Sequence, residues 1–147
     1  KELREAGCDA GQPTAWLAEG LLMYLPADAQ DGLFELVTEL SAPGSRIAAE
    51  TAGTVSGTRR KEMRERFARF AAQFGLEQAI DIQELIYEDP DRADLTDWLN
   101  NHGWRAEGLH SLDEMRRLGR YVELETKHDD NAFSTFVTAE RAPLSSS

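Results

Sequence analysis

The chain has 147 residues, of which 41% are hydrophobic, so it is long enough for one domain with a buried core. Its formal net charge of −11 disfavours both nucleic acid and anionic membranes as partners. No apolar run approaches the ~20 residues of a membrane span, and polar residues 1–11 lack the apolar stretch of a signal peptide. Cys8 has no second cysteine to pair with, which fits a reducing, cytoplasmic location.

The segment at residues 13–26 is the most informative part of the sequence. Residues 1–12, which precede it, are polar and are expected to form a linker or a helix end. An apolar run then predicts a strand at 14–19, covered on both faces as in the centre of a parallel sheet. Glu19 interrupts this run, and burying its carboxylate would be costly without a partner.

A strand–helix–strand unit is expected over residues 14–50. Pro26 and Asp28 suit the first turn of a helix, and apolar residues at helical spacing extend the predicted helix over 27–40. Pro43 and Gly44 mark a turn, and a short second strand is expected at 46–50. This spacing is typical of a crossover between two parallel strands.

The middle of the chain is expected to be a loop followed by a helix. Residues 51–58 are small and polar, whereas 59–74 form an amphipathic helix pattern, and 80–87 could be strand or loop. The helix begins with a basic run at 59–66. We interpret this run as a solvated helix face, although a lid helix that meets an anionic substrate is the alternative.

The chain from residue 89 onward is expected to alternate between helices and strands. Its predicted elements are a turn at 89–91, a helix at 94–101, a strand at 104–109, a helix at 111–118, a polar turn at 127–131, a strand at 133–139 and a tail from 142. The helix at 111–118 is expected to begin with a capping box, because Ser111 is followed three residues later by Glu114.

Three side chains are candidates for a functional site. Glu19 and Glu50 end the two predicted parallel strands, and ligands of open α/β sheets bind at the carboxyl ends of strands. Tyr24 follows on the turn into the helix. Each has an alternative interpretation: Glu19 as a helix cap or a solvated carboxylate, Tyr24 as a core aromatic, and Glu50 as a loop carboxylate.

Several common motifs are absent. His102, His110 and His128 lack the spacing of zinc ligands, both with one another and with Cys8. Ser56 stands one position too late for a nucleophile elbow between Gly53 and Gly57. No two glycines lie two residues apart, so the glycine-rich nucleotide-binding fingerprint is missing.

Two motifs in the sequence carry a resemblance to a known family. The first is Ala-Trp-Leu-Ala-Glu-Gly-Leu-Leu-Met-Tyr-Leu-Pro at 15–26, followed by Ala-Pro-Gly-Ser-Arg at 42–46. The second is Asp-Arg-Ala-Asp at 91–94, with Trp-Leu at 98–99 and His-Gly-Trp at 102–104. Together they closely resemble the S-adenosylmethionine-dependent O-methyltransferases of the leucine carboxyl methyltransferase family, and the branch related to polyketide O-methyltransferases is the most similar.

The resemblance implies an α/β fold, namely the C-terminal half of a Rossmann-like class I methyltransferase sheet. Strands 14–19 and 46–50 would be its fourth and fifth strands, and the last strand would be antiparallel. Residues 13–142 would form this domain part, with a helical cap inserted at 51–90 and a disordered tail at 143–147. Glu19 would approach the methionine portion of S-adenosylmethionine, while Tyr24 and Glu50 would lie at the rim of the acceptor pocket.

The family's glycine-rich donor loop has no counterpart in this sequence. The chain is therefore expected to be a fragment or a processed product, to bind the donor poorly alone, and to need a second copy or a missing N-terminal segment. The acceptor would be a small molecule or a peptide with a carboxylate or hydroxyl group. The alternative is a non-catalytic fragment or truncated paralogue that acts by association with a partner chain, because an unpaired strand edge recruits partners.

Overall fold

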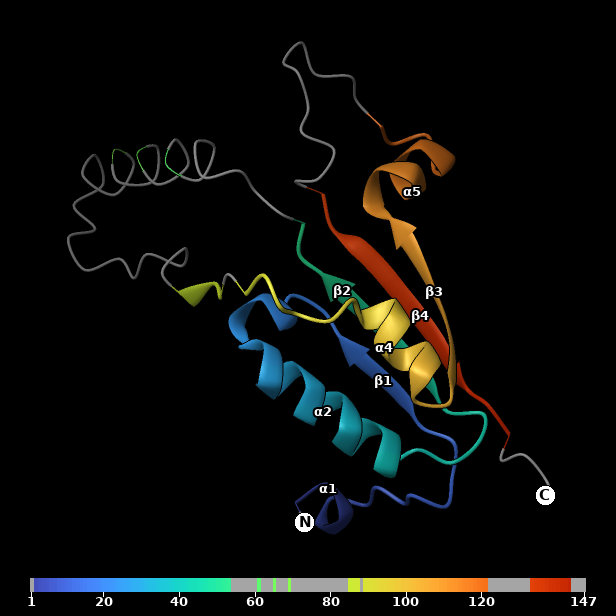
Figure 1. The fold of residues 1–147 in the computed structure, drawn as a ribbon. Helices are drawn as coiled ribbons and strands as arrows, with labels where there is room; N and C mark the ends of the chain where they lie inside the picture. The colour runs from blue at the N-terminus through green and yellow to red at the C-terminus, as the bar shows by residue number, and fades with distance from the viewer. Residues whose placement is uncertain are drawn as a thin grey trace.

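A computed structural model describes residues 2–53, 61, 65, 69, 85–87, 89–121 and 133–143 (Figure 1). Helices and strands alternate along most of this part of the chain. Their order is α1 (Glu2–Glu5), β1 (Ala15–Ala18), the 3-10 helix η1 (Leu22–Tyr24), α2 (Ala27–Glu39), β2 (Arg46–Thr51), α4 (Leu95–Asn101), β3 (Trp104–His110), α5 (Ser111–Arg117) and β4 (Thr135–Arg141).

The four strands form one mixed sheet in the order β1-β2-β4-β3. β1 and β2 are parallel, and β4 runs antiparallel to both of its neighbours, β2 and β3. The predicted parallel pair with a helical crossover and the predicted antiparallel last strand are therefore confirmed. An α/β architecture with this mixture of strand directions is consistent with a Rossmann-like fold.

The crossover helix α2 begins where its sequence predicts. Pro26 is the N-cap residue in extended conformation, and Asp28 lies in the first turn, where a negative charge is favourable. Gln30, Phe34 and Val37 form its buried stripe at helical spacing. Gly44, with a φ of +84°, makes the turn that leads into β2. These local signals explain why the boundaries of this unit agree with prediction to within one residue.

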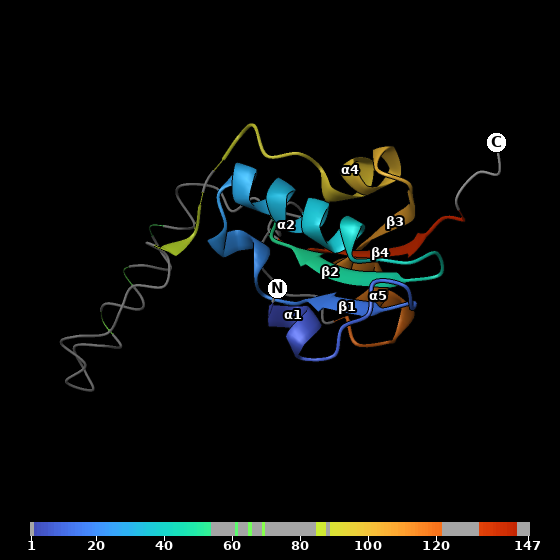
Figure 2. The same ribbon diagram turned by 90° about the horizontal axis from the view of Figure 1, so that it is seen from below.

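The hydrophobic core lies between one face of the sheet and the two helices α2 and α4 (Figure 2). The sheet contributes buried side chains that alternate along its strands, as expected for a face that packs against helices. The buried apolar residues of this core are Leu22, Phe34, Val37, Ile47, Ala49, Leu95, Trp98, Leu99, Trp104, Val137 and Ala139.

On the opposite face of the sheet, the large apolar side chains Leu17, Leu109 and Phe136 are exposed. Along β1 the side chains alternate between exposed and half-buried, and Leu17 is 75% exposed. β1 is also an edge strand, paired only with β2. The prediction of a central strand covered on both faces is therefore wrong for this structure, because the described residues give β1 one neighbouring strand, β2, and pack helices against only one face of the sheet.

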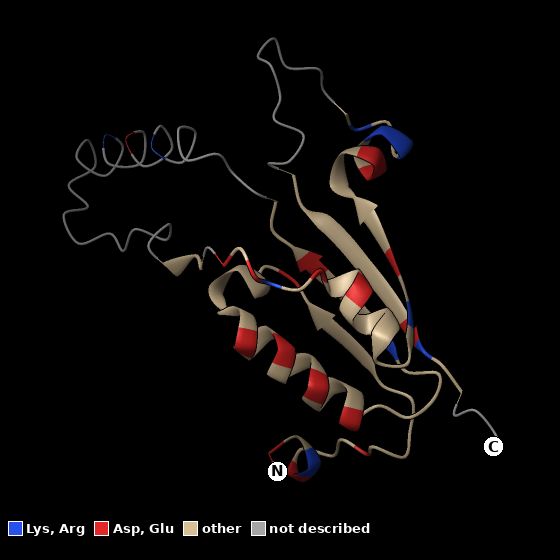
Figure 3. Cartoon of the chain, viewed as in Figure 1, with Lys and Arg blue, Asp and Glu red and all other residues tan. Residues whose placement is uncertain are grey.

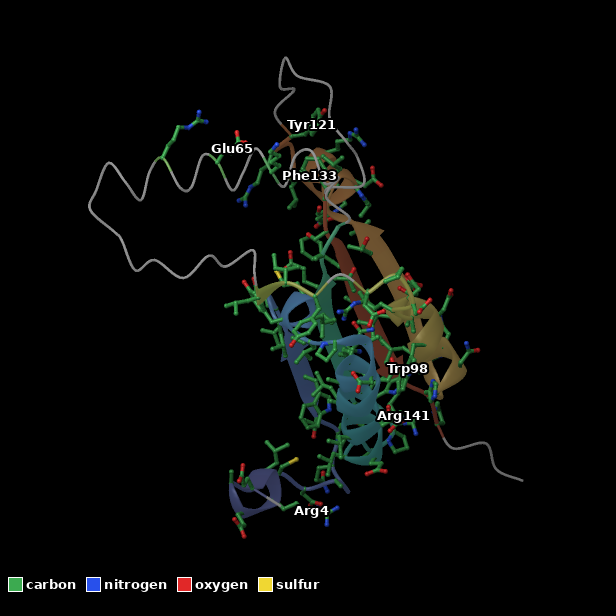
Figure 4. The ribbon with its side chains drawn as sticks, turned by 60° about the vertical axis from the view of Figure 1, so that its left-hand side comes forward. Arg4, Glu65, Trp98, Tyr121, Phe133 and Arg141 are labelled. Atoms are coloured by element: carbon green, nitrogen blue, oxygen red, sulfur yellow. The ribbon has the colours of Figure 1, made fainter. Side chains whose placement is uncertain are left out.

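A cluster of rings joins α4 to the ends of β3 and β4. Asp94 caps α4 by accepting a hydrogen bond from the Asp97 amide at 3.0 Å. The rings of Trp98 and His102 stack with centroids 3.6 Å apart. Arg141 donates to the carbonyl of His102 and lies 5.5 Å from the Trp104 ring centroid. Figure 4 shows Trp98 and Arg141 near each other at this end of the sheet.

The structure corrects two further predictions. Ser111 is the first helical residue of α5 and His110 is its N-cap, so the capping box does not form. The Ser111 amide instead donates to the Ser134 carbonyl at 2.9 Å, and Glu114 is bound by Arg117. The last strand starts and ends two residues later than predicted, at Thr135–Arg141, because its ladder with β2 and β3 extends to Glu140 and Arg141.

Some predictions fall wholly or largely outside the described residues. Of the predicted helix at 59–74, only positions 61, 65 and 69 are described, and they are helical and exposed. Most of the predicted cap at 51–90, the turn at 127–131 and the end of the tail also lie outside. Among the described residues, no helix has the length and apolar character needed to cross a membrane.

Candidate functional site at the carboxyl ends of β1 and β2

Glu19 and Glu50 lie at the same edge of the sheet. Ala18 pairs with Ala49, so each glutamate follows one of these two neighbouring strand positions. Glu19 is exposed and precedes Gly20, whose φ of +60° turns the chain away from β1. Glu50 is half-buried and is followed by one more strand residue, Thr51. The parallel pairing thus brings together two carboxylates that are far apart in the sequence.

Tyr24 lies in the short helix η1, which connects this edge to α2. Its amide donates to the Leu21 carbonyl at 3.0 Å, and the Leu25 amide donates to the Leu22 carbonyl at 3.2 Å. The side chain of Leu22 is buried in the core, whereas Tyr24 is 37% exposed. Tyr24 therefore projects from a turn that is anchored by its apolar neighbour.

A cavity of about 690 Å³ opens beside this turn. Its walls come from η1, from α2, from the end of β2 and from the segment that leads into α4. The lining residues are Leu22, Met23, Gln30, Thr51, Ala52, Gly53, Ile86, Tyr87, Asp89, Pro90, Arg92, Ala93, Asp94 and Leu95. Most of them are apolar, with a few polar groups among them, as in many small-molecule sites.

None of the three candidate residues is among those that line this cavity. Tyr24 follows the wall residues Leu22 and Met23, and Glu50 precedes the wall residue Thr51. In the sequence, Gly20 and Leu21 separate Glu19 from the wall residue Leu22. The structure therefore brings the candidates to the edge of the sheet that also borders the cavity, and their predicted roles stay predictions.

Sequence reasoning did not single out Arg92, which makes the most extensive polar contacts of the cavity wall. Its Nη1 donates to the Leu22 carbonyl at 3.2 Å and to Oε1 of Gln30 at 2.8 Å. Its Nη2 donates to the carbonyl of Leu25. One guanidinium thereby holds both ends of the turn that carries Tyr24 and the first part of α2.

Gln30 and Asp89 were missed as well. Gln30 is 2% exposed, and its Nε2 donates to the Ala93 carbonyl at 3.3 Å. Asp89 accepts a hydrogen bond from the Ala27 amide at 3.2 Å. A signal for Gln30 was present in the sequence, because this polar residue occupies a position of the apolar stripe of α2. A buried amide there implies a specific partner.

The surroundings of the cavity are acidic. Asp89 and Asp94 line it together with Arg92, so these three charged groups sum to one negative charge. Figure 3 shows acidic residues along α2, which carries Asp28, Asp31, Glu35 and Glu39 and no Lys or Arg. This charge favours a neutral or cationic ligand over an anion. Within the described residues, no group of three His, Cys, Asp or Glu side chains could hold a metal ion.

A comparison with known protein families finds a match to part of the chain. The model of the leucine carboxyl methyltransferase family matches residues 1–38. The matched segment contains β1, Glu19, η1 with Tyr24, and most of α2, but it does not contain Glu50 or Arg92. The match suggests a methyltransferase. Methyltransferases of this family generally use S-adenosylmethionine.

Proposed function

We propose that this chain is part of an S-adenosylmethionine-dependent O-methyltransferase. The observation that carries the proposal is the family match over residues 1–38, because it includes the strand, the glutamate and the turn at the candidate site. The mixed sheet with an antiparallel last strand supports it, since the resemblance implies the same strand directions. A cytoplasmic location, consistent with one unpaired cysteine, belongs to the proposal.

The donor-facing residue in this proposal is Glu19. S-adenosylmethionine, when bound, supplies a methyl group on a positively charged sulfonium and also carries an ammonium group. The exposed Glu19 carboxylate and the nearby Glu50 fit these positive charges better than they fit an anion. The sequence has no glycine-rich loop for the rest of the donor, so the residues present fit only its methionine portion.

The cavity beside η1 is the proposed acceptor site, with Tyr24 and Glu50 at its rim. Its apolar walls suit a largely apolar small molecule or peptide segment that ends in an oxygen nucleophile. Holding that oxygen in line with the methyl group would supply much of the rate acceleration. A carboxylate acceptor would need no base, whereas a hydroxyl acceptor would need one within hydrogen-bond reach.

Donor binding also requires that the sheet be completed beside β1. The two edges of the sheet differ. At the β3 edge, the Asn100 side chain binds the backbone of Ala106: it accepts from the amide at 2.9 Å and donates to the carbonyl at 3.2 Å. The outer edge of β1 pairs with no strand in the described part of the chain. We propose that further polypeptide with the glycine-rich loop joins this edge, either in the same protein or in a partner.

Titration calorimetry with S-adenosylhomocysteine tests this proposal. Protein purified from its natural source, with any polypeptide that stays bound, should bind with a micromolar Kd, and the isolated 147-residue chain should bind far more weakly. Glu19→Gln should weaken binding about tenfold or more, because a hydrogen bond to a charged group contributes ~1.5–3 kcal/mol. The matched control is Glu35→Gln, which removes an exposed carboxylate from α2.

Two results would decide against parts of the proposal. Absence of binding by the natural protein would overturn the methyltransferase assignment and favour the alternative, a non-catalytic chain that works by association. Micromolar binding by the isolated chain would overturn the need for a completed sheet.

A further inference from the structure

The segment before α4 is tied to the turn between β1 and α2 by a set of hydrogen bonds. The Tyr87 amide donates to the Met23 carbonyl at 3.0 Å, and the Ala27 amide donates to Oδ2 of Asp89 at 3.2 Å. Arg92 and Gln30 add the contacts described above. These bonds join residues more than 60 positions apart, so they fix one segment of the chain against the other.

Arg92 has the central position in this set. Its acceptors at the turn are the carbonyls of Leu22, the first residue of η1, and Leu25, the C-cap residue. Tyr24 lies between these two residues. The planar guanidinium directs its N–H groups along fixed directions, so it can bind several acceptors that surround it. A lysine ammonium is a single point of charge and cannot reproduce the same spread of contacts.

Gln30 holds the other side of the guanidinium. Its Oε1 accepts from Arg92 while its Nε2 donates to the Ala93 carbonyl, so the amide is bound at both ends. Because Gln30 is 2% exposed, water cannot readily replace either partner. The side chain of Arg92 is therefore bound by a buried residue of α2 rather than by an exposed one.

We propose that Arg92 is a positioning residue that fixes the turn at residues 22–25, and with it Tyr24, against the wall of the cavity. The positioning itself follows from the contacts of this chain. Its consequence for methyl transfer rests on the proposed function. In that function Arg92 links the wall of the acceptor cavity to the turn that follows Glu19. The acceptor cavity and the donor-facing Glu19 are thereby kept in a fixed arrangement.

The effect of losing Arg92 should be local. The turn has few hydrogen bonds of its own, and of its residues 22–25 Leu22 is in the buried core while Leu25 packs against it. A segment at the border of the core with few hydrogen bonds opens at lower free energy than core strands. Removal of the guanidinium should therefore loosen residues 22–30, 85–87 and 89–94 while β2 and β4 keep their protection.

Hydrogen exchange of the 147-residue chain tests the positioning directly. In Arg92→Met the amides of Tyr24 and Leu25 should exchange about tenfold faster or more, whereas those of Ile47 and Val137 should keep their rates. Arg92→Lys should restore only a small part of the protection. Arg117→Met, which removes an exposed guanidinium from α5, is the matched control and should leave the turn unchanged. Equal acceleration throughout the sheet, or none at the turn, would overturn the proposal.

A second measurement separates this inference from the proposed function. The natural protein with Arg92→Met, measured well below its melting transition, should bind S-adenosylhomocysteine about tenfold more weakly. Unchanged affinity together with a loosened turn would overturn the coupling to the donor site. If the wild-type protein does not bind at all, the proposed function fails, and the exchange rates at Tyr24 and Leu25 still decide whether Arg92 positions the turn.

Discussion

Trp104 donates its indole Nε1–H to Oγ1 of Thr38 at 2.9 Å, which ties β3 to α2 over the core. Trp104 is 3% exposed, so its polar atom needs a partner within the protein. Trp16 makes an equivalent bond, at 2.9 Å, to Oγ of Ser41 just after the same helix. Helix α2 is thus attached by indole hydrogen bonds to strands at both edges of the sheet.

Thr38→Val should destabilise the protein by about 1–2 kcal/mol, because it keeps the shape of the side chain but leaves the buried indole N–H without its acceptor. The free energy of unfolding from urea titration measures the effect. Thr138→Val, on the open face of β4, is the matched control and should change it by less than about 0.5 kcal/mol. Equal effects of the two substitutions on the free energy of unfolding would show that the hydrogen bond from the Trp104 indole does not contribute to stability.

Two glycines should respond to alanine with opposite signs. Gly103 has a φ of +81°, a conformation that disfavours a side chain, so Gly103→Ala should cost about 1–2 kcal/mol of unfolding free energy. Its new Cβ would also approach Nη1 of Arg141 to 2.5 Å. Gly32 lies within α2 with open space around the site of a Cβ, and Gly32→Ala should stabilise by about 0.5–1 kcal/mol. Thermal and urea unfolding of both variants would check the signs, and a stabilising Gly103→Ala would contradict the argument.

The ion pair of Glu114 with Arg117 should be visible in a titration. Hydrogen bonds from Arg117, reinforced by its charge and opposed by desolvation, lower the pKa of Glu114 below its ordinary value of 4.5. Since the folded-state pKa is lowered, the stabilising contribution is present above about pH 4.5 and is lost as the pH falls through the folded value. NMR titration of the Glu114 carboxyl should give a midpoint below 4.5, and Arg117→Gln should raise it.

Arg116→Gln is the control for this titration, because Arg116 binds Asp113 rather than Glu114. It should leave the midpoint of Glu114 in place. A midpoint that shifts equally in both variants would mean that the overall charge of α5, rather than the Arg117 contact, sets the pKa.

The elements with strong local signals could be predicted from the sequence. The crossover over residues 14–50 was predicted because Pro26 and Asp28 mark a helix start and Gly44 marks a turn, and the structure has the same unit as β1, α2 and β2. Helix α4 likewise begins after its capping residue Asp94. Such signals depend on neighbours in the chain, so no knowledge of tertiary contacts is needed to interpret them.

Features that depend on distant partners were not predictable in the same way. Glu114 could have capped α5, but Arg117 competes for its carboxylate, and Ser134 takes the amide that a capping box would need. Arg92 stands in a polar turn whose sequence gives no indication of the three acceptors that surround it. The exposure of β1 was missed because an apolar run indicates burial but does not identify what covers it.

The open side of β1 provides the last prediction. Leu17 is 75% exposed, so Leu17→Lys should change the unfolding free energy of the isolated chain by less than about 0.5 kcal/mol. A charge on an edge strand disfavours pairing with further strands, so the same substitution should reduce association of the chain with itself or with a partner. Light scattering of the chain, and recovery of bound polypeptide with the natural protein, measure this effect.

Leu36→Lys, at a 58% exposed position of α2, is the matched control and should leave association unchanged. Association that Leu17→Lys leaves unchanged, or equal loss of association in both variants, would contradict the assignment of the β1 edge as the joining surface.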